Sequence, residues 1–547
     1  MADTKQRGLA FLQQFNLAKS QRAIWDSQYQ DLKNVVRPDG GNFQTQTAQG
    51  DRRYNQIYDG TAIHACEEFA SGLHSYLTSP TDRWFELGVD TDISQNPEAA
   101  LWLEDVAEQM YGIYSDSRSN FNPALSELYL DLGAFGTGVI LQEWDEDLNF
   151  ITFRNDNVNQ FYFEEDSRGR VCGVYQYFDF TSQQIREKYE RDGMLEGTDI
   201  LKIILLPYNA YKKFKLVRYV GPNANRIPGK LTSKNKAFCS ITVVEQTGEV
   251  IRDSGYDSLP YAVPRWVKIG GETYGRGPAH KCLPDAMALQ TMERTMLKAG
   301  QKAVDPPLQI PSEGFMEPIS QAPGSLIYKE PGSEEIKALE FKGNLNFGVE
   351  QSNQKRAYIE KCFYTEWFKR FHKNREQSAT EVLDDRDEML RFLAPMLGRQ
   401  QTELLGPLIK RTYELLHERN QIKPAPVILQ GRKLSVNYIS PAARAQQGVR
   451  ADRVSRFMQD ITPLMQMDQG IVDSLDTNAM VKLYASTRGV SSKIFRTDAA
   501  VNAIRQQRAQ KQNAMDMAQT AEPASKTLLN LAQAKAAGGG GNPGGPV

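Results

Sequence analysis

The stretch of sequence that decides the fold begins with Gly270-Gly271-Glu272-Thr273-Tyr274-Gly275-Arg276-Gly277-Pro278 and ends at Leu397. A long helical pattern follows, in which apolar residues recur at steps of three and four: Cys282, Ala286, Leu289, Met292, Met296, Ala299 and Ala303. Residues 306–341 are broken by proline and glycine and predict short strands. A second helical pattern, over residues 349–375, has steps of four at Ile359, Phe363, Trp367 and Phe371. Two long helices around a small inserted module predict a stalk with a tip.

Prolines set the expected ends and bends of these helices. Pro284 falls near the start of the first helix, where a first-turn proline is tolerated, so the regular helix can begin there or at Pro278. A third helix is predicted over residues 378–419, because Ser-Ala-Thr-Glu at its start fits a capping box. Pro395 and Pro407 lie inside it, so we expect one long bent helix.

Periodicity along the rest of the chain predicts an α+β fold that is mainly helical. Further helices are expected over residues 5–36, 54–77, 97–114, 123–135, 448–487 and 499–511. Strands are expected over residues 84–89, 139–144, 151–154, 171–180, 200–206, 214–220, 237–245 and 427–438. The chain after Met515 ends in a run of Gly and Pro, which cannot bury enough apolar surface to become ordered.

The composition is that of a soluble globular protein of several domains. The chain has 547 residues, 40% hydrophobic and 24% charged, with a net charge of −2. Any contact with nucleic acid must therefore come from local basic patches, since the overall field is weak. Five scattered cysteines and few histidines argue against a zinc site or a disulfide framework. We find no signal peptide and no membrane span, so we expect synthesis in a reducing cytoplasm.

The motifs of catalysis and cofactor binding are absent. There is no phosphate-binding GxxxxGK[ST] loop and no HExxH, and Gly275-Arg276-Gly277 is too short for a dinucleotide fingerprint. Glu164-Glu165-Asp166 resembles a solvated turn more than an acid–base pair, and His64 and His74 resemble ordinary helix residues. We therefore predict no catalytic residue, no metal and no cofactor. An enzyme with an unrecognised site in residues 139–268 is kept as an alternative.

Basic residues near the two long helices are the best functional candidates. Four positive charges fall within seven positions, at Lys369, Arg370, Lys373 and Arg375, next to Asn374. Such a run usually forms a solvated helix end, where positive charge suits the helix dipole. Its place at the turn after a long helix favours contact with a polyanion. A second set, Arg294, Lys298 and Lys302, steps by four along a separate face of the first helix.

The order of these parts resembles the portal, or head-to-tail connector, proteins of short-tailed (podovirus) tailed bacteriophages. The likeness extends from about residue 54 to residue 511. The segments that carry it are Leu73-His74-Ser75-Tyr76-Leu77-Thr78-Ser79-Pro80 with Trp84-Phe85, Ser119-Asn120-Phe121 through Gly136-Thr137-Gly138, Gly271-Glu272-Thr273-Tyr274-Gly275-Arg276, residues 381–416 and residues 450–488. Each motif is short, and their order and spacing together are more specific than any one of them.

The resemblance implies an architecture and a set of partners. It implies a wing at residues 1–277, stem helices at 278–302 and 347–371, a clip at 303–346, a tunnel loop at 372–378, a long kinked wing helix with a return strand at 379–440, a crown at 441–514 and a disordered tail at 515–547. It further implies a homo-dodecameric ring at one capsid vertex of the virion, assembled in the host cytoplasm. Double-stranded DNA would pass without sequence readout through its axial channel, which Lys373 and Arg375 would contact. Implied protein partners are the terminase large subunit, the major capsid and scaffold proteins and a tail adaptor. The alternative is a non-phage helical nucleic-acid-binding scaffold that forms no ring.

Overall fold

The computed structural model describes residues 2–45, 48, 50–81, 83–89, 97–190, 195, 198–227, 229–230, 232–309, 328, 331–332, 336–338, 345–370, 393–439, 457, 481, 501, 503–513 and 530–533. Contacts divide the chain into two units. The first comprises Met1–Leu87, Val106–Pro424 and Ser435–Ala443, and the second comprises Gly88–Asp105, Ala425–Leu434 and Arg444–Val547. The second unit contains the start of helix α4 (Pro97–Ser115) and the short helix η7 (Val427–Leu429). Every contact discussed below lies within the first unit.

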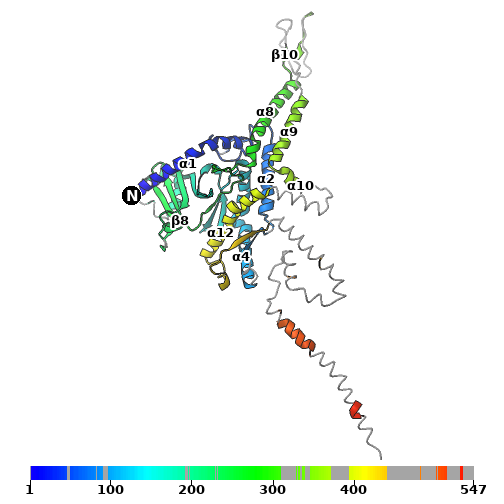
Figure 1. Ribbon diagram of the computed structural model, residues 1–547. Helices are drawn as coiled ribbons and strands as arrows, with labels where there is room; N and C mark the ends of the chain where they lie inside the picture. The colour runs from blue at the N-terminus through cyan, green and yellow to red at the C-terminus, as the bar shows by residue number, and fades with distance from the viewer. Residues whose placement is uncertain are drawn as a thin grey trace, which may run out of the picture. The chain divides into compact units, whose positions relative to one another are not determined.

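A five-stranded antiparallel sheet forms one part of the first unit. Its strands follow chain order: β4 (Phe161–Glu165), β5 (Val171–Thr181), β6 (Lys213–Pro222), β7 (Phe238–Val244) and β8 (Val250–Tyr256). The 34-residue helix α1 (Ala2–Val35) lies along the sheet and buries Leu12 and Phe15 against one face (Figure 1). Helices α6 (Ser182–Tyr189) and α7 (Asp199–Ile204) contribute to a cluster on the opposite face. Alternation of side chains along each strand lets both faces be buried at once.

A smaller sheet and a helical layer complete the body of this unit. The sheet has the order β3-β2-β9, from β3 (Phe150–Asn155), β2 (Ile140–Asp145) and β9 (Tyr261–Ala262). In the adjoining helical layer, helix α2 (Thr61–Leu77) packs on helix α5 (Phe121–Phe135). A further pair of strands joins β1 (Phe85–Gly88) to β12 (Ser435–Tyr438), and short 3-10 helices occur at η1 (Ser117–Ser119), η2 (Val158–Gln160), η4 (Pro207–Asn209) and η5 (Ser233–Asn235). The prediction of a mixed α+β fold is confirmed.

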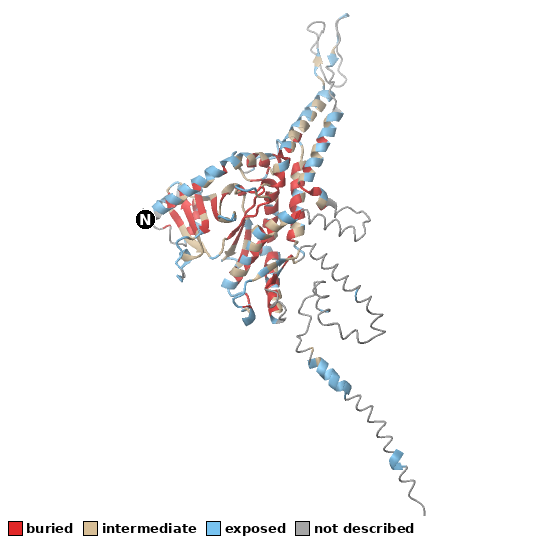
Figure 2. Ribbon diagram, in the orientation of Figure 1, coloured by how far each residue is buried: buried red, intermediate tan, exposed pale blue. Residues whose placement is uncertain are grey.

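The predicted stalk is a projecting pair of antiparallel helices. Helix α8 (Pro278–Val304) runs outward and α9 (Leu345–Cys362) returns beside it, with β10 (Leu308–Gln309) and β11 (Lys337–Ala338) paired beyond them (Figure 1). The helix begins at Pro278, and Pro284 is accommodated inside it. The last buried residue of α8 is Leu289, so the outer half of the pair carries little buried surface (Figure 2).

The second helix of the stalk is not continuous. Helix α9 ends at Cys362, and α10 (Thr365–Arg370) begins after Tyr364, whose φ is 60°. In a continuous helix, Phe363 and Phe368 would point about 140° apart. The break allows both rings to reach Phe69 of α2, at centroid distances of 6.2 and 6.4 Å. The single helix predicted over residues 349–375 is wrong at this point, because tertiary packing overrides the helical period.

The strand predicted over residues 200–206 is also wrong, because most of these residues belong to helix α7 (Asp199–Ile204). The backbone N–H of Leu201 donates to the Thr198 hydroxyl, which caps the helix. Side chains of Ile200 and Ile204, four positions apart, are then buried on one helical face. A run of adjacent apolar residues does not by itself distinguish a strand from a short helix.

The helix predicted to bend at its prolines departs from regular α-helical geometry just before Pro407. Residues 393–400 are helical, η6 (Gln401–Leu405) is one π-helical turn, and α12 (Gly406–Glu418) continues from it. A π-turn is a common way to accommodate a bend in a helix. The predicted start of this helix at residue 378 lies outside the described residues. Within the described part of the chain, no helix has the length and apolarity needed to cross a bilayer.

Candidate functional site

Two glycine motifs meet where α8 leaves the body. The backbone N–H of Gly275 donates to the Thr137 hydroxyl at 2.8 Å, which places Gly275-Arg276-Gly277 across Gly136-Thr137-Gly138. A Cβ atom on Gly136 would collide with the backbone nitrogen of Gly277, and one on Gly277 would lie 2.5 Å from the carbonyl oxygen of Leu132. Only glycine permits this approach of two backbones. The crossing therefore fixes where the projecting helix begins.

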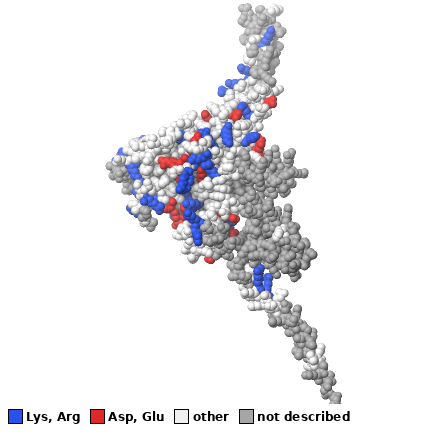
Figure 3. All heavy atoms as spheres, in the orientation of Figure 1, with Lys and Arg blue, Asp and Glu red and all other residues white. Residues whose placement is uncertain are grey.

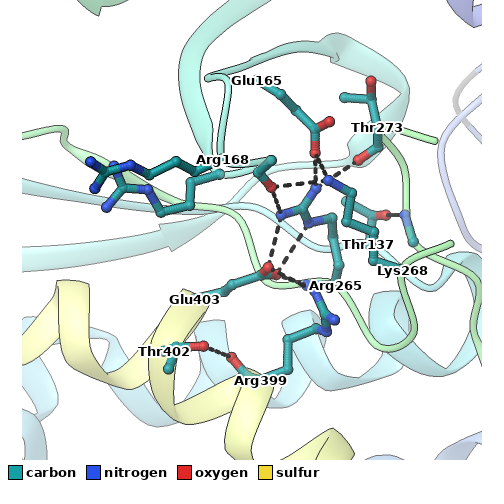
Figure 4. A network of polar contacts seen from close by, with 12 residues as sticks. Thr137, Glu165, Arg168, Arg265, Lys268, Thr273, Arg399, Thr402 and Glu403 are labelled. Atoms are coloured by element: carbon teal, nitrogen blue, oxygen red, sulfur yellow. Dashed lines mark hydrogen bonds and ion pairs between the residues drawn. The ribbon is translucent and has the colours of Figure 1, made fainter. Parts of the chain in front are cut away.

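Arg265 connects this crossing to the π-turn (Figure 4). Its side chain is 1% exposed and donates to Glu403 in η6 at 2.8 Å and to Glu165 at the end of β4. It also donates to the carbonyl oxygens of Gly169 at 2.9 Å and Thr273 at 3.1 Å. Burial by itself would lower the pKa of Arg265, but Glu403 and Glu165 outweigh it and the pKa is raised. One buried guanidinium thus ties the β4–β5 turn and η6 to the residues that precede α8.

A second cluster holds the base of the stalk. Both backbone N–H groups of Tyr58 and Asp59 donate to the Gln290 side chain, at 2.7 and 3.0 Å. Arg356 of α9 reaches the Asp59 carboxylate at 2.8 Å and Glu293 of α8 at 2.6 Å. Burial would raise the pKa of Asp59, but hydrogen bonds from Thr61 and Arg356 outweigh burial, and the pKa is lowered. These contacts bind both stalk helices to the chain that enters α2.

The predicted basic residues of α8 remain on the surface. Lys298 and Lys302 are exposed, and Arg294 is exposed with its guanidinium 5.8 Å from the ring centre of Tyr58. Figure 3 shows Lys and Arg side chains recurring along the stalk among uncharged ones, with fewer acidic side chains. Glu293, the residue before Arg294 in α8, is paired with Arg356 of α9.

The remaining candidate residues are only partly described. Lys369 and Arg370 lie in α10, which packs against α2 and α9 at the base of the stalk. Lys373, Asn374 and Arg375, with the rest of the predicted tunnel loop, lie outside the described residues. Lys302 is near the outer end of α8, so among the described residues it is not brought together with Lys369 and Arg370 within a subunit.

The acidic residues considered for catalysis have structural roles. Glu164 accepts hydrogen bonds from the hydroxyls of Tyr175 at 2.8 Å and Tyr219 at 3.1 Å. Glu165 pairs with Lys268 at 2.6 Å as well as with Arg265. Among the described residues, no group of three His, Cys, Asp or Glu side chains is arranged to hold a metal ion. The residue that sequence reasoning missed is Arg265, whose only local signal is a charge beside Trp266 in an apolar stretch.

Comparison with known proteins identifies the family. The sequence profile described as "Bacteriophage head to tail connecting protein" matches residues 10–495. The chain belongs to this family. Among head-to-tail connecting proteins, it is 29% identical over 543 residues to the "Probable portal protein" of Bordetella phage BPP-1, covering 97% of this chain and 96% of the relative. It is 28% identical over 543 residues to the "Portal protein" of Salmonella phage epsilon15, covering 96% of each.

Membership of the head-to-tail connecting protein family resolves the alternatives left by the sequence. The match covers the sheet-rich region as well as the stalk, so both regions belong to the part of the chain that the family profile describes. The prediction that the chain is a phage structural component and not an enzyme is confirmed by this family. A non-phage scaffold is excluded on the same ground.

Proposed function

We propose that the chain is a portal subunit that forms a ring of about a dozen copies at one capsid vertex of the virion. DNA is packaged and ejected through the axial channel of this ring. The stalk supports this proposal most directly. Its outer half is exposed in the single subunit and carries large apolar side chains, with Leu297 54%, Phe347 60% and Val349 48% exposed. Apolar side chains on a long, rigid projection need a covering partner, and neighbouring copies in a closed ring provide one.

The division of the subunit follows from this ring. Residues 1–277 form the wing, residues 278–302 and 347–371 the stem, residues 303–346 the clip, residues 372–378 the tunnel loop, residues 379–440 the kinked wing helix with its return strand, and residues 441–514 the crown. The clip docks the terminase large subunit during packaging and a tail adaptor afterwards. The wing and crown meet the major capsid and scaffold proteins. Assembly takes place in the host cytoplasm.

Basic residues of the stem and the tunnel loop make weak contacts with the DNA backbone. Arg294, Lys298 and Lys302 are spaced about 6 Å apart along the helix axis, whereas DNA carries one charge per about 1.7 Å. A sparse row neutralises few phosphates at a time, so the duplex can slide. Contacts of this kind go to phosphates and carry no sequence information. Lys373 and Arg375 of the tunnel loop act in the same way.

Two measurements test the proposal. Negative-stain electron microscopy with light scattering should show rings of about a dozen subunits with a central hole, and a chain that stays monomeric under all assembly conditions contradicts it. The double variant Lys373→Glu, Arg375→Glu should form rings but shorten or release the packaged DNA. A matched control, Arg226→Glu with Lys230→Glu, makes the same charge change in the exposed β6–β7 loop. If packaged DNA length is the same in both variants, the tunnel-loop role is wrong.

A further inference from the structure

The loop between α7 and β6 exposes a cluster of aromatic and apolar side chains. Tyr208 is 81% exposed and Tyr211 is 85% exposed, and Leu205 and Leu206 beside them are 52% and 37% exposed. Tyrosine and leucine are usually largely buried, and adjoining exposed apolar side chains mark interaction surfaces. We call Leu205, Leu206, Tyr208, Tyr211, Lys212 and Lys213 the Tyr–Lys patch.

The backbone of this patch is held in one conformation. Asn209, which is 8% exposed, donates from its side chain to the carbonyl oxygen of Ile203 at 2.9 Å. Its own carbonyl oxygen accepts from the hydroxyl of Ser182 at 2.7 Å and from the backbone N–H of Lys212 at 2.9 Å. Two rings presented on a fixed loop lose little conformational entropy on binding. The patch is therefore pre-organised for a partner.

The patch carries uncompensated positive charge. Lys212 and Lys213 are exposed, and neither forms an ion pair with another described residue. The nearby Lys202 is neutralised by Asp199, with the two charged groups 2.9 Å apart. Two positive charges beside exposed phenol rings and leucines fit a protein surface that combines acidic and apolar side chains.

The same chain presents such a surface on the turn between β2 and β3. We call Asp145, Glu146, Asp147 and Leu148 the acidic tip. Leu148 is 50% exposed, and the Asp145 carboxylate accepts from the backbone N–H groups of Asp147 and Leu148 at 2.9 and 3.0 Å, which fixes the turn. Only Glu146 has a cationic partner among the described residues, in Arg419. The three tip carboxylates and the Arg419 guanidinium have a net charge of −2. This charge is equal in magnitude and opposite in sign to that of Lys212 and Lys213.

The two surfaces adjoin different elements of the subunit. Glu249 in the β7–β8 turn accepts from the backbone N–H groups of Asp199 and Ile200, which places α7 and the patch beside that turn. The acidic tip is joined through Arg419 to the end of α12. A contact between different surfaces of neighbouring copies is heterologous, which is the kind that generates a ring.

We propose that the acidic tip of one copy docks on the Tyr–Lys patch of its neighbour. Leu148 packs against Tyr208 and Tyr211, and the tip carboxylates face Lys212 and Lys213. This inference rests on the proposed ring and names one of its subunit contacts. The stem helices supply the remaining contacts, so the patch adjusts the strength of assembly and does not act alone.

A charge-exchange experiment tests the contact. One variant carries Lys212→Glu with Lys213→Glu, and the other carries Glu146→Lys with Asp147→Lys. In either variant alone, like charges meet at every contact, and the subunit concentration for half-assembly should rise by about tenfold or more. In an equimolar mixture, alternating copies restore opposite charges at every contact, so rings should return with equal numbers of the two variants by native mass spectrometry. A folding defect does not give rescue on mixing.

Controls separate this inference from the ring itself. Arg226→Glu with Lys230→Glu makes the same charge change at the opposite end of β6 and should assemble as the parent does. The pair Tyr208→Ser and Tyr211→Ser should weaken assembly without lowering the thermal midpoint of the subunit. If either charge variant alone forms rings at the same concentration as the parent, the proposed contact is wrong, but the proposed ring is not contradicted. If the Lys212 and Lys213 variant forms normal rings but loses DNA binding, the patch binds nucleic acid and the proposed subunit contact is also wrong. A parent chain that never forms rings overturns both proposals.

Discussion

Replacement of Arg265 by methionine should destabilise the subunit strongly. The variant keeps the unbranched apolar stem of the side chain but removes the guanidinium that faces Glu165 and Glu403, which are only 20% and 18% exposed. Removing one partner of a buried ion pair costs about 3–5 kcal/mol, because the other charge is left buried. Both carboxylates retain a second cation, Lys268 at 2.6 Å and Arg399 at 3.2 Å. We therefore expect the lower end, about 3 kcal/mol, or roughly two orders of magnitude in the unfolding equilibrium.

The measurement combines urea unfolding with local hydrogen exchange. The backbone N–H of Arg276 donates to the Val267 carbonyl at 2.8 Å, and that of Gly275 donates to Thr137, so both amides report on the segment that precedes α8. Exchange at these amides should accelerate more than exchange in the five-stranded sheet. A control, Arg170→Met, breaks a pair with Asp166 in which the arginine is 69% exposed, and should cost less than about 1 kcal/mol.

A double-mutant cycle decides whether Arg265 acts through Glu403. The variants Arg265→Met and Glu403→Gln should be non-additive by about 0.5–3 kcal/mol, because each removes the same interaction. A loss of less than about 1 kcal/mol for Arg265→Met, or strict additivity in the cycle, would refute the role assigned to this residue. It would mean that the segments around it are held by apolar packing alone.

Three further predictions concern the stalk. Gly277→Ala, just before α8, should destabilise by about 1–3 kcal/mol through the collision with the carbonyl oxygen of Leu132. Gly300→Ala, inside α8, meets no atom within 4 Å and should stabilise by about 0.5–1 kcal/mol in thermal unfolding. Because the pKa of Asp59 is lowered, its pairing with Arg356 stabilises the folded subunit fully above about pH 4, and this stabilisation is lost as the pH falls through the lowered pKa. Amide exchange in α9 should therefore increase in acid, and the variant Arg356→Gln should abolish this increase. Leu297→Ser, at a 54% exposed position, should leave subunit stability within about 0.5 kcal/mol but weaken ring assembly by light scattering.

The stalk could be predicted from the sequence because its signals are local. Apolar steps of three and four along α8 reflect its contacts with α9 and the body, and the prolines at its start and end fix its length. The break at Tyr364 could not be predicted in this way. It depends on where Phe69, nearly 300 residues earlier in the chain, presents its ring to Phe363. Periodicity records the face of a helix and not the partner that this face meets.

The Arg265 cluster lies beyond sequence reasoning for a related reason. Its partners Glu165 and Glu403 are 100 and 138 residues away, and nothing near any of the three residues signals the others. The glycine motifs were visible as breaks in a pattern, but their meeting was not. Positions such as Gly136 and Gly277 become informative only when two backbones are known to cross. Long-range polar contacts and close backbone approach are thus the parts of this fold that require coordinates.

The rigidity of the stalk base matters for the proposed ring. In the proposed ring, neighbouring stems contact each other far from the base of α8. A small tilt of α8 at its base would therefore displace the side chains near its outer end and misalign these contacts. The glycine crossing and Arg265 fix the start of α8. The pairing of Arg356 with Asp59 and Glu293 fixes both helices about one turn beyond Leu289, the last buried residue of α8. Exposed residues such as Leu297 are then presented to a neighbour in a set position, and the entropy lost on assembly is smaller than for a freely tilting arm. The buried polar contacts at the base therefore hold the exposed apolar surface of the stalk in the position that the proposed ring assembly requires.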